Sequence, residues 1–251
     1  MDLRGRVIVI IGGTTGLGAS ATRAYLTAGA NVVAVGKSGG EIGDAKIIAA
    51  DATDPKTAAA AIELAVTTFG GFHGLYHVAG GSGRSKGDGP LHEFSDEGWE
   101  YTIAQNLTSV AYSNRAAAKQ FLAQRSGGAV VNLSSVLAFS PAPRNFSTHA
   151  YAAAKAGVIG LTRSAAAYYA PENIRFNVIA PGLVETPMSA RAIADPEIQR
   201  FIRLKQPLDG GRIGQVKDVD ETVVLLLSDA SKFITGQVIS VDGGWGVTQT
   251  V

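Results

Sequence analysis

The chain has 251 residues, of which 46% are apolar and 17% charged, and its net charge is +1. This composition excludes a disordered chain and, without a long basic run, argues against nucleic acid or an anionic membrane as the main partner. Cysteine is absent, which excludes disulfides, thiolate metal sites and a cysteine nucleophile, and we predict no metal site. Neither a secretory signal nor an apolar run of membrane-spanning length is present, so we expect a cytoplasmic protein.

Seven short apolar runs predict β-strands, and segments of helical period lie between them. The predicted strands span residues 6–11, 31–35, 45–50, 74–79, 129–133, 175–180 and 237–241. The predicted helices span residues 17–29, 55–69, 96–125, 149–170 and 216–229. Most strands are apolar almost throughout, which is typical of a parallel sheet covered by helices on both faces. Residues 36–46 are too short and glycine-rich for a full helix, so we expect a loop or a single turn there.

The repeated strand–helix–strand order predicts an α/β fold, a doubly wound Rossmann-type parallel sheet of seven strands with helices on both faces. No linker rich in proline, glycine or serine divides the pattern, so residues 1–251 are interpreted as a single dinucleotide-binding and catalytic domain. Residues 184–210 have too few apolar repeats for a core helix throughout. We expect this segment to form a lid over the substrate.

The first strand runs into the turn I-G-G-T-T-G-L-G, which contains Gly12, Gly16 and Gly18. Glycine permits a tight turn and lets peptide N–H groups approach a pyrophosphate at a helix N-terminus. The motif alone is weak, because a tight turn that binds nothing uses the same residues. Its position between an apolar strand and a helix favours a dinucleotide site.

The stretch V-G-K-S-G-G, which begins at Val35, allows three interpretations. A P-loop requires an earlier glycine where asparagine stands, and a hydrolase nucleophile elbow requires a helix directly after Ser38, which the following glycines disfavour. Gly36 and Lys37 instead end the second strand, where an acidic residue would hold the ribose of NAD. Lys37 and Ser38 suit the 2′-phosphate of NADP. The alternative is a solvated surface lysine, with Glu41 as the best candidate for binding NAD.

Tyr151 and Lys155 lie four residues apart in Y-A-A-A-K, so a helix places both on one face. An ammonium beside a phenol lowers the phenol pKa from about 10 and suits it to general acid–base chemistry. Such a pair also arises by chance. Ser134 and Ser135 follow the fifth strand, at the edge where open α/β sheets bind ligands.

Asn106 lies on a helical stripe with Trp99, Ile103 and Val110. This spacing places a polar amide on the buried face of the helix, where it requires hydrogen-bond partners. Asn106 is therefore either part of a catalytic group or a buried asparagine that braces the core.

Taken in order, these motifs resemble the short-chain dehydrogenase/reductase family of the classical type over essentially the full length of the chain. Gly12, Gly16 and Gly18 match the family's glycine motif, and Asp51 matches its adenine-contacting aspartate. The family's four catalytic positions are matched by Asn106, Ser135, Tyr151 and Lys155. N-V-I-A-P-G-L-V-E-T is similar to the family's Pro-Gly segment, and V-D-G-G at 241–244 resembles its terminal signature.

The resemblance implies an oxidoreductase that transfers a hydride between NADP(H) and an alcohol or carbonyl substrate, with NAD(H) left open. Tyr151 would donate a proton to the carbonyl oxygen or accept it in reverse. Lys155 would lower the pKa of Tyr151 and bind the nicotinamide ribose. Ser135 would hold the substrate oxygen, with Ser134 as the fallback, and Asn106 would support a water in a proton relay.

The resemblance also implies a cofactor site that extends from the glycine turn to the Pro-Gly segment. Thr186 of that segment would contact the nicotinamide carboxamide. The residues expected to bind the cofactor are Gly12, Thr14, Thr15, Gly16, Leu17, Gly18, Lys37, Ser38, Asp51, Ala52, Ala79, Gly80, Tyr151, Lys155, Pro181, Gly182, Val184 and Thr186.

The chain departs from the family pattern at two turns. Ile11 stands where the family has threonine, and H-V-A-G, beginning at His77, replaces Asn-Asn-Ala-Gly. That threonine helps to tie the two turns together, and we expect Ile11 and Val78 to replace the polar tie with apolar packing. The interval between Ser135 and Tyr151 is longer than usual and is expected to shape the substrate pocket.

The glycine-rich loop 80–90 carries Arg84 and Lys86 beside the predicted mouth of the site. With Arg144 and His149 these cations could favour an acidic substrate. The alternative is a solvated loop with ordinary charges.

Two other functions stay open, because a fold alone does not specify an activity. One is a catalytically silent dinucleotide-sensing or scaffold protein, which the filled catalytic positions disfavour. The other is a lyase-like or dehalogenating relative, which is disfavoured because such proteins usually change the lysine position. The small-residue helix around Tyr151 allows close packing, and the resemblance implies a homotetramer.

Overall fold

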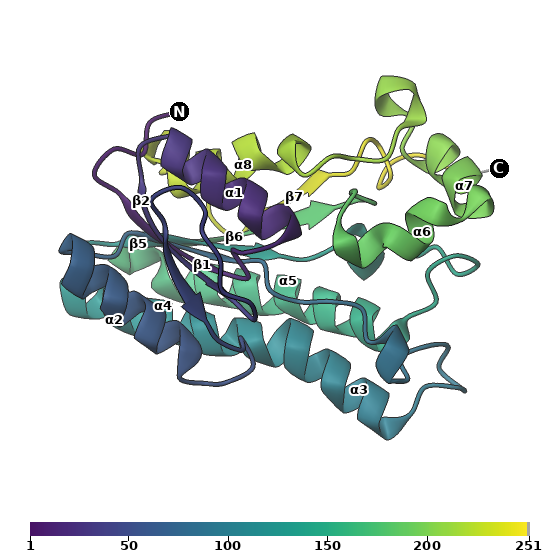
Figure 1. Ribbon diagram of the computed structural model, residues 1–251, viewed down its shortest axis with the longest axis horizontal. Coiled ribbons are helices and arrows are strands. Elements are labelled where there is room, and N and C mark those ends of the chain that lie inside the picture. The colour runs from purple at the N-terminus through teal and green to yellow at the C-terminus, as the bar shows by residue number, and fades with distance from the viewer. Residues whose placement is uncertain (250–251) are drawn as a thin grey trace.

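The protein, described here by a computed structural model for residues 1–249, is built on one seven-stranded sheet (Figure 1). Its strands run in the order β3-β2-β1-β4-β5-β6-β7, and every neighbouring pair is parallel. The strands are β1 (Val7–Ile11), β2 (Asn31–Gly36), β3 (Lys46–Ala49), β4 (Gly74–His77), β5 (Gly128–Leu133), β6 (Ile174–Pro181) and β7 (Val238–Val241). The predicted doubly wound, single-domain parallel sheet is confirmed.

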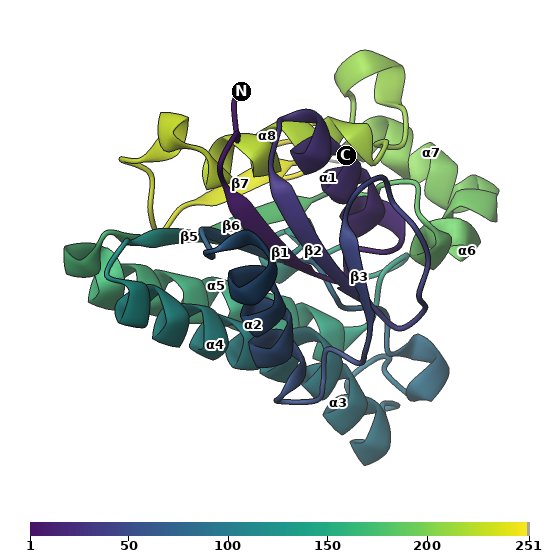
Figure 2. The same cartoon turned by 60° about the vertical axis from the view of Figure 1, so that its left-hand side comes forward.

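Helices cover both faces of the sheet (Figure 2). On one face lie α1 (Gly16–Thr27) and α8 (Lys217–Leu227), which pack against each other. On the other face lie α2 (Thr57–Phe69), α4 (Ser109–Gln124) and α5 (His149–Tyr169). Residues 37–45, between Gly36 and Lys46, form no helix, as the sequence predicts, so β3 follows β2 without a crossover helix.

The core divides according to the alternation of side chains along each strand. Val7, Val9 and Ile11 of β1 belong to a buried cluster that includes residues of α2 and α4. Ile8 and Ile10 belong to a second cluster that includes residues of α1 and α8. Successive strand residues point to opposite faces, so a strand covered on both sides must be apolar throughout. This explains why the strands appear in the sequence as short continuous apolar runs.

The predicted helix 96–125 is interrupted. It consists of α3 (Asp96–Ile103), a π-helical turn over Ala104–Thr108, and α4. The Asn106 side chain donates to the carbonyl of Thr102 at 2.9 Å, which is the acceptor that the Asn106 N–H would use in a regular α-helix. Occupation of that carbonyl by a side chain accounts for the widened turn, which places Asn106 in the wall between the helix and the loop after β4.

The segment predicted to form a lid contains two short helices, α6 (Ala190–Ala194) and α7 (Pro196–Lys205). The arrows of β6 and β7 point toward these helices, which lie beyond the carboxyl edge of the sheet (Figure 1). Ile198 and Ile202 of α7 are buried in a small cluster with Trp245. The segment thus carries more apolar packing than its sequence suggests, and its movement as a lid stays a prediction.

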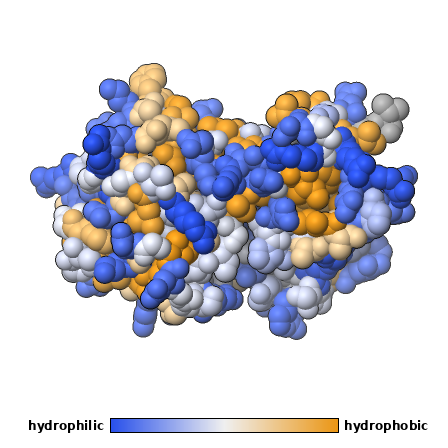
Figure 3. All heavy atoms as spheres, turned by 45° about the horizontal axis from the view of Figure 1, so that its top comes forward, coloured by the Kyte–Doolittle hydropathy of each residue, from blue (hydrophilic) through white to orange (hydrophobic). Residues whose placement is uncertain are grey.

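Apolar side chains gather on the right-hand part of one face, the side on which α6 and α7 lie (Figure 3). Met188, Leu204 and Leu208 of this region have side chains that are more than half exposed. Across residues 1–249, none of the helices is both long enough and apolar enough to span a membrane.

Candidate active site

A groove of about 280 Å³ runs past the turn between β1 and α1. It gathers most of the predicted cofactor residues from segments far apart in the sequence. Those that line it are Gly12, Thr14, Thr15, Gly16, Leu17, Gly18, Lys37, Ser38, Asp51, Ala52, Ala79, Gly80 and Thr186. The parallel strands bring these positions together because their carboxyl ends meet at one edge of the sheet.

Two glycines of the turn are required by close main-chain contacts. Gly12 has φ +95°, and a Cβ atom there would lie 2.5 Å from the Ala79 nitrogen. A Cβ atom on Gly18 would collide with the Gly12 carbonyl oxygen. A larger residue at Gly12 would push the glycine turn away from the turn after β4, and one at Gly18 would push the first turn of α1 away from the glycine turn.

The same two turns are tied by the main chain. The Ile11 carbonyl accepts hydrogen bonds from the Val78 and Ala79 N–H groups, at 2.9 and 2.8 Å. Neither apolar side chain turns out to solvent, because Ile11 packs in the α2–α4 cluster and Val78 against the α1–α8 cluster. Both side chains thus have the expected apolar packing, on opposite faces of the sheet, and it is the main chain that ties the two turns together.

Lys37 and Asp51 form an ion pair at one end of the groove, with Nζ 3.1 Å from a carboxylate oxygen. Hydrogen bonds from the N–H and hydroxyl groups of Thr53, with a smaller contribution from Lys37, hold the pKa of Asp51 below its usual value. The Lys37 and Asp51 side chains are 63% and 46% exposed. An ion pair this exposed contributes at most about 1 kcal/mol, so Lys37 is available to other anions.

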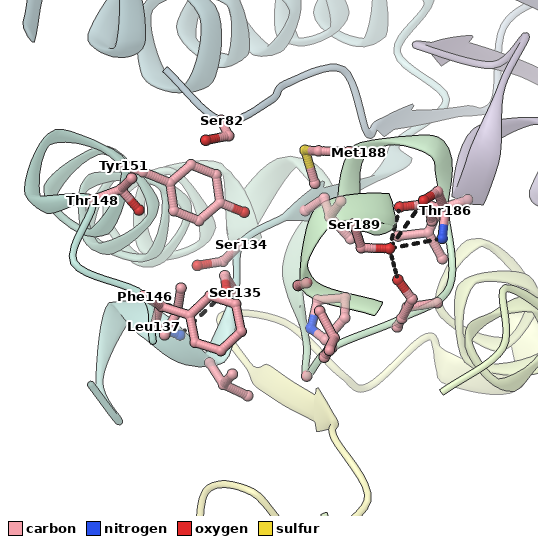
Figure 4. Close-up of a pocket in the computed structure, with 18 of the residues that line it drawn as sticks. Ser82, Ser134, Ser135, Leu137, Phe146, Thr148, Tyr151, Thr186, Met188 and Ser189 are labelled. Atoms are coloured by element: carbon pink, nitrogen blue, oxygen red, sulfur yellow. Dashed lines mark hydrogen bonds between the residues drawn. The ribbon is translucent and has the colours of Figure 1, made fainter. Parts of the chain in front are cut away.

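A second cavity, of about 520 Å³, adjoins the groove. Ser134, Ser135 and Tyr151 line one side, and Thr186 and Met188 the other (Figure 4). The Tyr151 hydroxyl points into the space between these walls (Figure 4). Four predicted cofactor residues, Tyr151, Pro181, Gly182 and Val184, line this cavity and not the groove, and Lys155 lines neither.

Tyr151 and Lys155 lie on α5, and burial shifts both of their pKa values. Burial raises the pKa of Tyr151 to about 12, and the Ser135 hydroxyl opposes this effect. Burial lowers the pKa of Lys155 to about 8. Lys155 Nζ donates to the Leu133 carbonyl at 2.9 Å and lies 5.6 Å from the centroid of the Tyr151 ring. The lowering of the Tyr151 pKa expected from Lys155 is therefore absent in this arrangement, in which burial dominates.

The two serines after β5 differ in their partners. The Ser134 hydroxyl donates to the Lys155 carbonyl at 2.7 Å and is buried, so it braces α5 against β5. The Ser135 hydroxyl accepts from the Leu137 N–H at 3.2 Å, which leaves its own proton free for a ligand. This difference favours Ser135 over Ser134 as the group that holds a substrate oxygen.

The Asn106 side chain lines neither cavity. Its amide accepts from the Gly81 N–H at 3.0 Å and donates to the carbonyls of Gly81 and Thr102, both at 2.9 Å. A Cβ atom on Gly80 would lie 2.7 Å from Asn106 Oδ1 and 3.3 Å from Lys155 Nζ. Asn106 therefore fixes the loop after β4 beside Lys155. This agrees with the bracing role that the sequence allows as the alternative to a catalytic one.

Sequence reasoning missed three residues of the site. Asp88 caps α5, Trp245 closes the cavity from the C-terminal segment, and Arg191 lines the cavity from α6. No short sequence pattern marks any of the three, because each reaches the site through contacts between segments that are far apart in the sequence. Among residues 1–249, no three or more histidine, aspartate or glutamate side chains are grouped so that they could hold a metal ion.

Comparisons with known proteins agree with this architecture. A family model described as enoyl-(acyl carrier protein) reductase matches residues 12–246. The chain is 35% identical over 250 residues to cis-4-hydroxycyclohexanecarboxylate dehydrogenase of Sinomonas cyclohexanicum, with 96% of each chain covered. It is 36% identical to 3beta-hydroxysteroid dehydrogenase 1 of Eggerthella lenta, over 97% of this chain and 94% of that one. The structure of a short-chain type dehydrogenase/reductase from Mycobacterium ulcerans matches with a TM-score of 0.90 and 30% identity, over 99% of this chain and 92% of that one.

The sheet order, the glycine turn and the Tyr151–Lys155 pair thus occur in a chain that matches this family along nearly its whole length. The protein belongs to the short-chain dehydrogenase/reductase family, as its motifs predict. The relatives are oxidoreductases named for alcohol substrates, and the family uses NAD(P)(H).

Proposed function

We propose that the protein is an NADP(H)-dependent oxidoreductase that interconverts an alcohol and its ketone or aldehyde. One observation carries this proposal. The cavity that contains the Tyr151 hydroxyl and Ser135 adjoins the groove of the glycine turn, and both are lined by Leu17, Leu133, Thr186 and Met188. A carbonyl group held at Ser135 would therefore lie beside one end of a ligand in the groove.

The groove fits a dinucleotide. Helix α1 begins at Gly16, and its N-cap residue, Thr15, makes no side-chain hydrogen bond to the first turn. The N–H groups of that turn are thus left for the pyrophosphate, which the partial positive charge of the helix end also attracts. Lys155 would bind the nicotinamide ribose and Thr186 the carboxamide. When bound, the cofactor supplies or accepts the hydride.

The chain's own residues handle the proton and the substrate oxygen. In reduction, the Tyr151 hydroxyl donates its proton to the carbonyl oxygen, and in oxidation the tyrosinate takes the proton from the alcohol. The raised pKa of Tyr151, about 12, keeps the hydroxyl protonated at neutral pH and suits the reductive direction. Ser135 donates a hydrogen bond to the same oxygen, and Lys155, with a pKa of about 8, is still cationic at pH 7.

The proposed preference for NADP(H) rests on Lys37 and on the contact between Thr14 and Gly36. The Lys37 ammonium lines the groove at the end of β2, where a 2′-phosphate would lie. A side chain at Gly36 would collide with the Thr14 side chain, so there is no room for the acidic residue that binds the ribose of NAD. The lysine favours NADP(H), and the contact between Thr14 and Gly36 acts against NAD(H).

The test is fluorescence titration of the purified protein with NADPH and NADH, followed by turnover of cyclic ketones and alcohols. Tyr151→Phe should lower kcat by at least about 10²-fold, the lower end for general acid–base catalysis, and change the Kd of NADPH less than about two-fold. Tyr168→Phe, at a strongly exposed position of α5, is the matched control. Near-normal turnover by Tyr151→Phe would contradict the assignment. Cofactor binding without any turnover would favour the silent dinucleotide-sensing protein.

A further inference from the structure

We propose that Arg84 and Arg191 form an anion subsite of the substrate cavity, and that the substrate is a cyclic hydroxy or oxo acid whose carboxylate they bind. The inference rests on the proposed function, because it names the substrate class of the same site. Three observations support it: the arginines that line the cavity, their lack of salt bridges among residues 1–249, and their absence from the lining of the cofactor groove.

The charge of the cavity wall is one-sided. Arg84 and Arg191 line it, and within the part of the chain that the structure describes its lining includes neither aspartate nor glutamate. Neither arginine takes part in a salt bridge among residues 1–249. Both arginines are exposed to solvent, and a carboxylate that enters the cavity can accept charge-assisted hydrogen bonds from a guanidinium group.

The two arginines come from different segments. Arg84 lies in a 3-10 turn, Arg84–Lys86, in the loop after β4, and Arg191 lies on α6 beyond β6. The other cations singled out in the sequence, Lys86, Arg144 and His149, do not line the cavity. Of the cations on the glycine-rich loop, Arg84 thus lines the cavity, together with an arginine from α6 that no sequence pattern indicates.

The cofactor is not the anion that these arginines fit. Neither Arg84 nor Arg191 lines the groove of the glycine turn, where Lys37 is the cation at the end of β2. The arginines instead share a cavity with Ser135 and Tyr151. The anionic group therefore belongs to the molecule that carries the reacting oxygen.

The remaining wall defines the middle of that molecule. Apart from its hydroxyl-bearing residues and the two arginines, the cavity is lined largely by apolar side chains, which include Leu137, Phe146, Val184, Met188, Ala192 and Trp245. Such a surface favours an apolar body, and a volume of about 520 Å³ admits a ring. A molecule that carries a hydroxyl or ketone, an apolar ring and a carboxylate matches these three kinds of lining residue.

Trp245 provides a readout that does not depend on turnover. It lines the cavity and is 1% exposed, whereas the chain's other tryptophan, Trp99, stacks on Phe94 away from both cavities. In a Trp99→Phe background, fluorescence therefore reports on ligands in the cavity. We would titrate this protein with cyclohexanecarboxylate, with cyclohexanecarboxamide and with cyclohexyl phosphate.

The carboxylate should bind at least about 10-fold more tightly than the amide, since hydrogen bonds to charged groups are the stronger ones. Arg84→Gln and Arg191→Gln should each reduce this ratio, and the double variant should bring it within about two-fold. Lys86→Gln and Arg144→Gln remove nearby charges that do not line the cavity and should leave the ratio unchanged.

Equal binding of acid and amide, or no binding of either, would overturn the anion subsite. A preference for the phosphate ester over the carboxylate would overturn the assignment of a carboxylic acid as the substrate. The proposed function is tested separately, by NADPH oxidation with 4-oxocyclohexanecarboxylate and with its amide. If it is wrong, neither ketone is reduced although the carboxylate binds. If only the subsite is wrong, both ketones are reduced with similar kcat/KM.

Discussion

The Asp88 carboxylate binds the main chain of Tyr151. Its two oxygens accept hydrogen bonds from the Ala150 and Tyr151 N–H groups, both at 3.0 Å, and its side chain is almost fully buried. The N-cap residue of α5, Thr148, makes no side-chain cap of its own. The first turn of α5 is therefore capped by a residue of the loop after β4, which sets the position of the tyrosine.

Asp88→Ala should destabilise the protein and misplace Tyr151. Loss of a helix cap costs about 0.5–2 kcal/mol of the free energy of unfolding, measured by urea unfolding. Because Tyr151 is the proposed acid, we expect kcat to fall by about 10-fold or more while the Kd of NADPH changes little. Asp88→Asn, which keeps one acceptor, should recover part of kcat.

The control for this prediction is Ser95→Ala. Ser95 caps α3 by accepting from the Gly98 N–H at 3.0 Å, and it lines neither cavity. Ser95→Ala should therefore lose a comparable part of the free energy of unfolding and keep a normal kcat. Equal kcat for Asp88→Ala and the unmodified protein would show that the cap does not position Tyr151.

Lys155 should make stability depend on pH in the alkaline range. Its pKa is about 8 in the folded protein and 10.5 in the unfolded chain. Between these values the unfolded state binds more protons, so stability rises with pH, and below about pH 8 the effect is flat. Relative to Lys155→Met, the unmodified protein should gain up to about 3 kcal/mol between pH 8 and 10.5.

Urea unfolding at pH 7, 8, 9 and 10 measures this gain. Lys119→Met, at an exposed position of α4, is the control for removing a lysine. A difference between the unmodified protein and Lys155→Met that stays constant over this range would show that burial does not lower the pKa of Lys155.

Lys37→Met should weaken NADPH binding by about 10-fold or more and leave NADH binding nearly unchanged, because a charge-assisted contact with the 2′-phosphate is lost. Fluorescence titration measures both Kd values. Lys46→Met, on neighbouring β3 but outside the groove, should change neither. If NADPH affinity survives in Lys37→Met, the lysine is only the partner of Asp51.

Gly36→Asp alone should weaken both cofactors, because the new side chain would collide with Thr14. Gly36→Asp combined with Thr14→Gly removes the collision. The combined variant should prefer NADH, since its carboxylate can accept from the ribose hydroxyls and repels a 2′-phosphate. A preference for NADH in the single variant would mean that Thr14 moves freely and does not select the cofactor.

Much of the fold is predictable because its signals are local. The five inner strands of the sheet come from apolar runs that are largely buried on both faces, and glycine turns separate many of the elements. Tyr151 and Lys155 are found together since one helical turn separates them. Ser135 is found because the end of a parallel strand is a ligand-binding edge.

The rest depends on contacts between distant residues. Asp88 meets Tyr151 across 63 positions, and the Trp245 indole N–H donates to the Ser140 carbonyl across 105. The Asn106 side chain bonds to Gly81 of the loop after β4, a contact that helical periodicity cannot show. No pattern in a single sequence reports such pairings, so the walls of the cavity become known only from the folded chain.

The four residues shared by the two cavities, Leu17, Leu133, Thr186 and Met188, make cofactor and substrate energetically interdependent. Any ligand that changes the arrangement of Thr186 or Met188 from one side alters the shape offered on the other. Linkage requires that the factor by which the cofactor raises substrate affinity equals the factor by which substrate raises cofactor affinity. A substitution at one of these four positions should therefore change the affinities for cofactor and for substrate together.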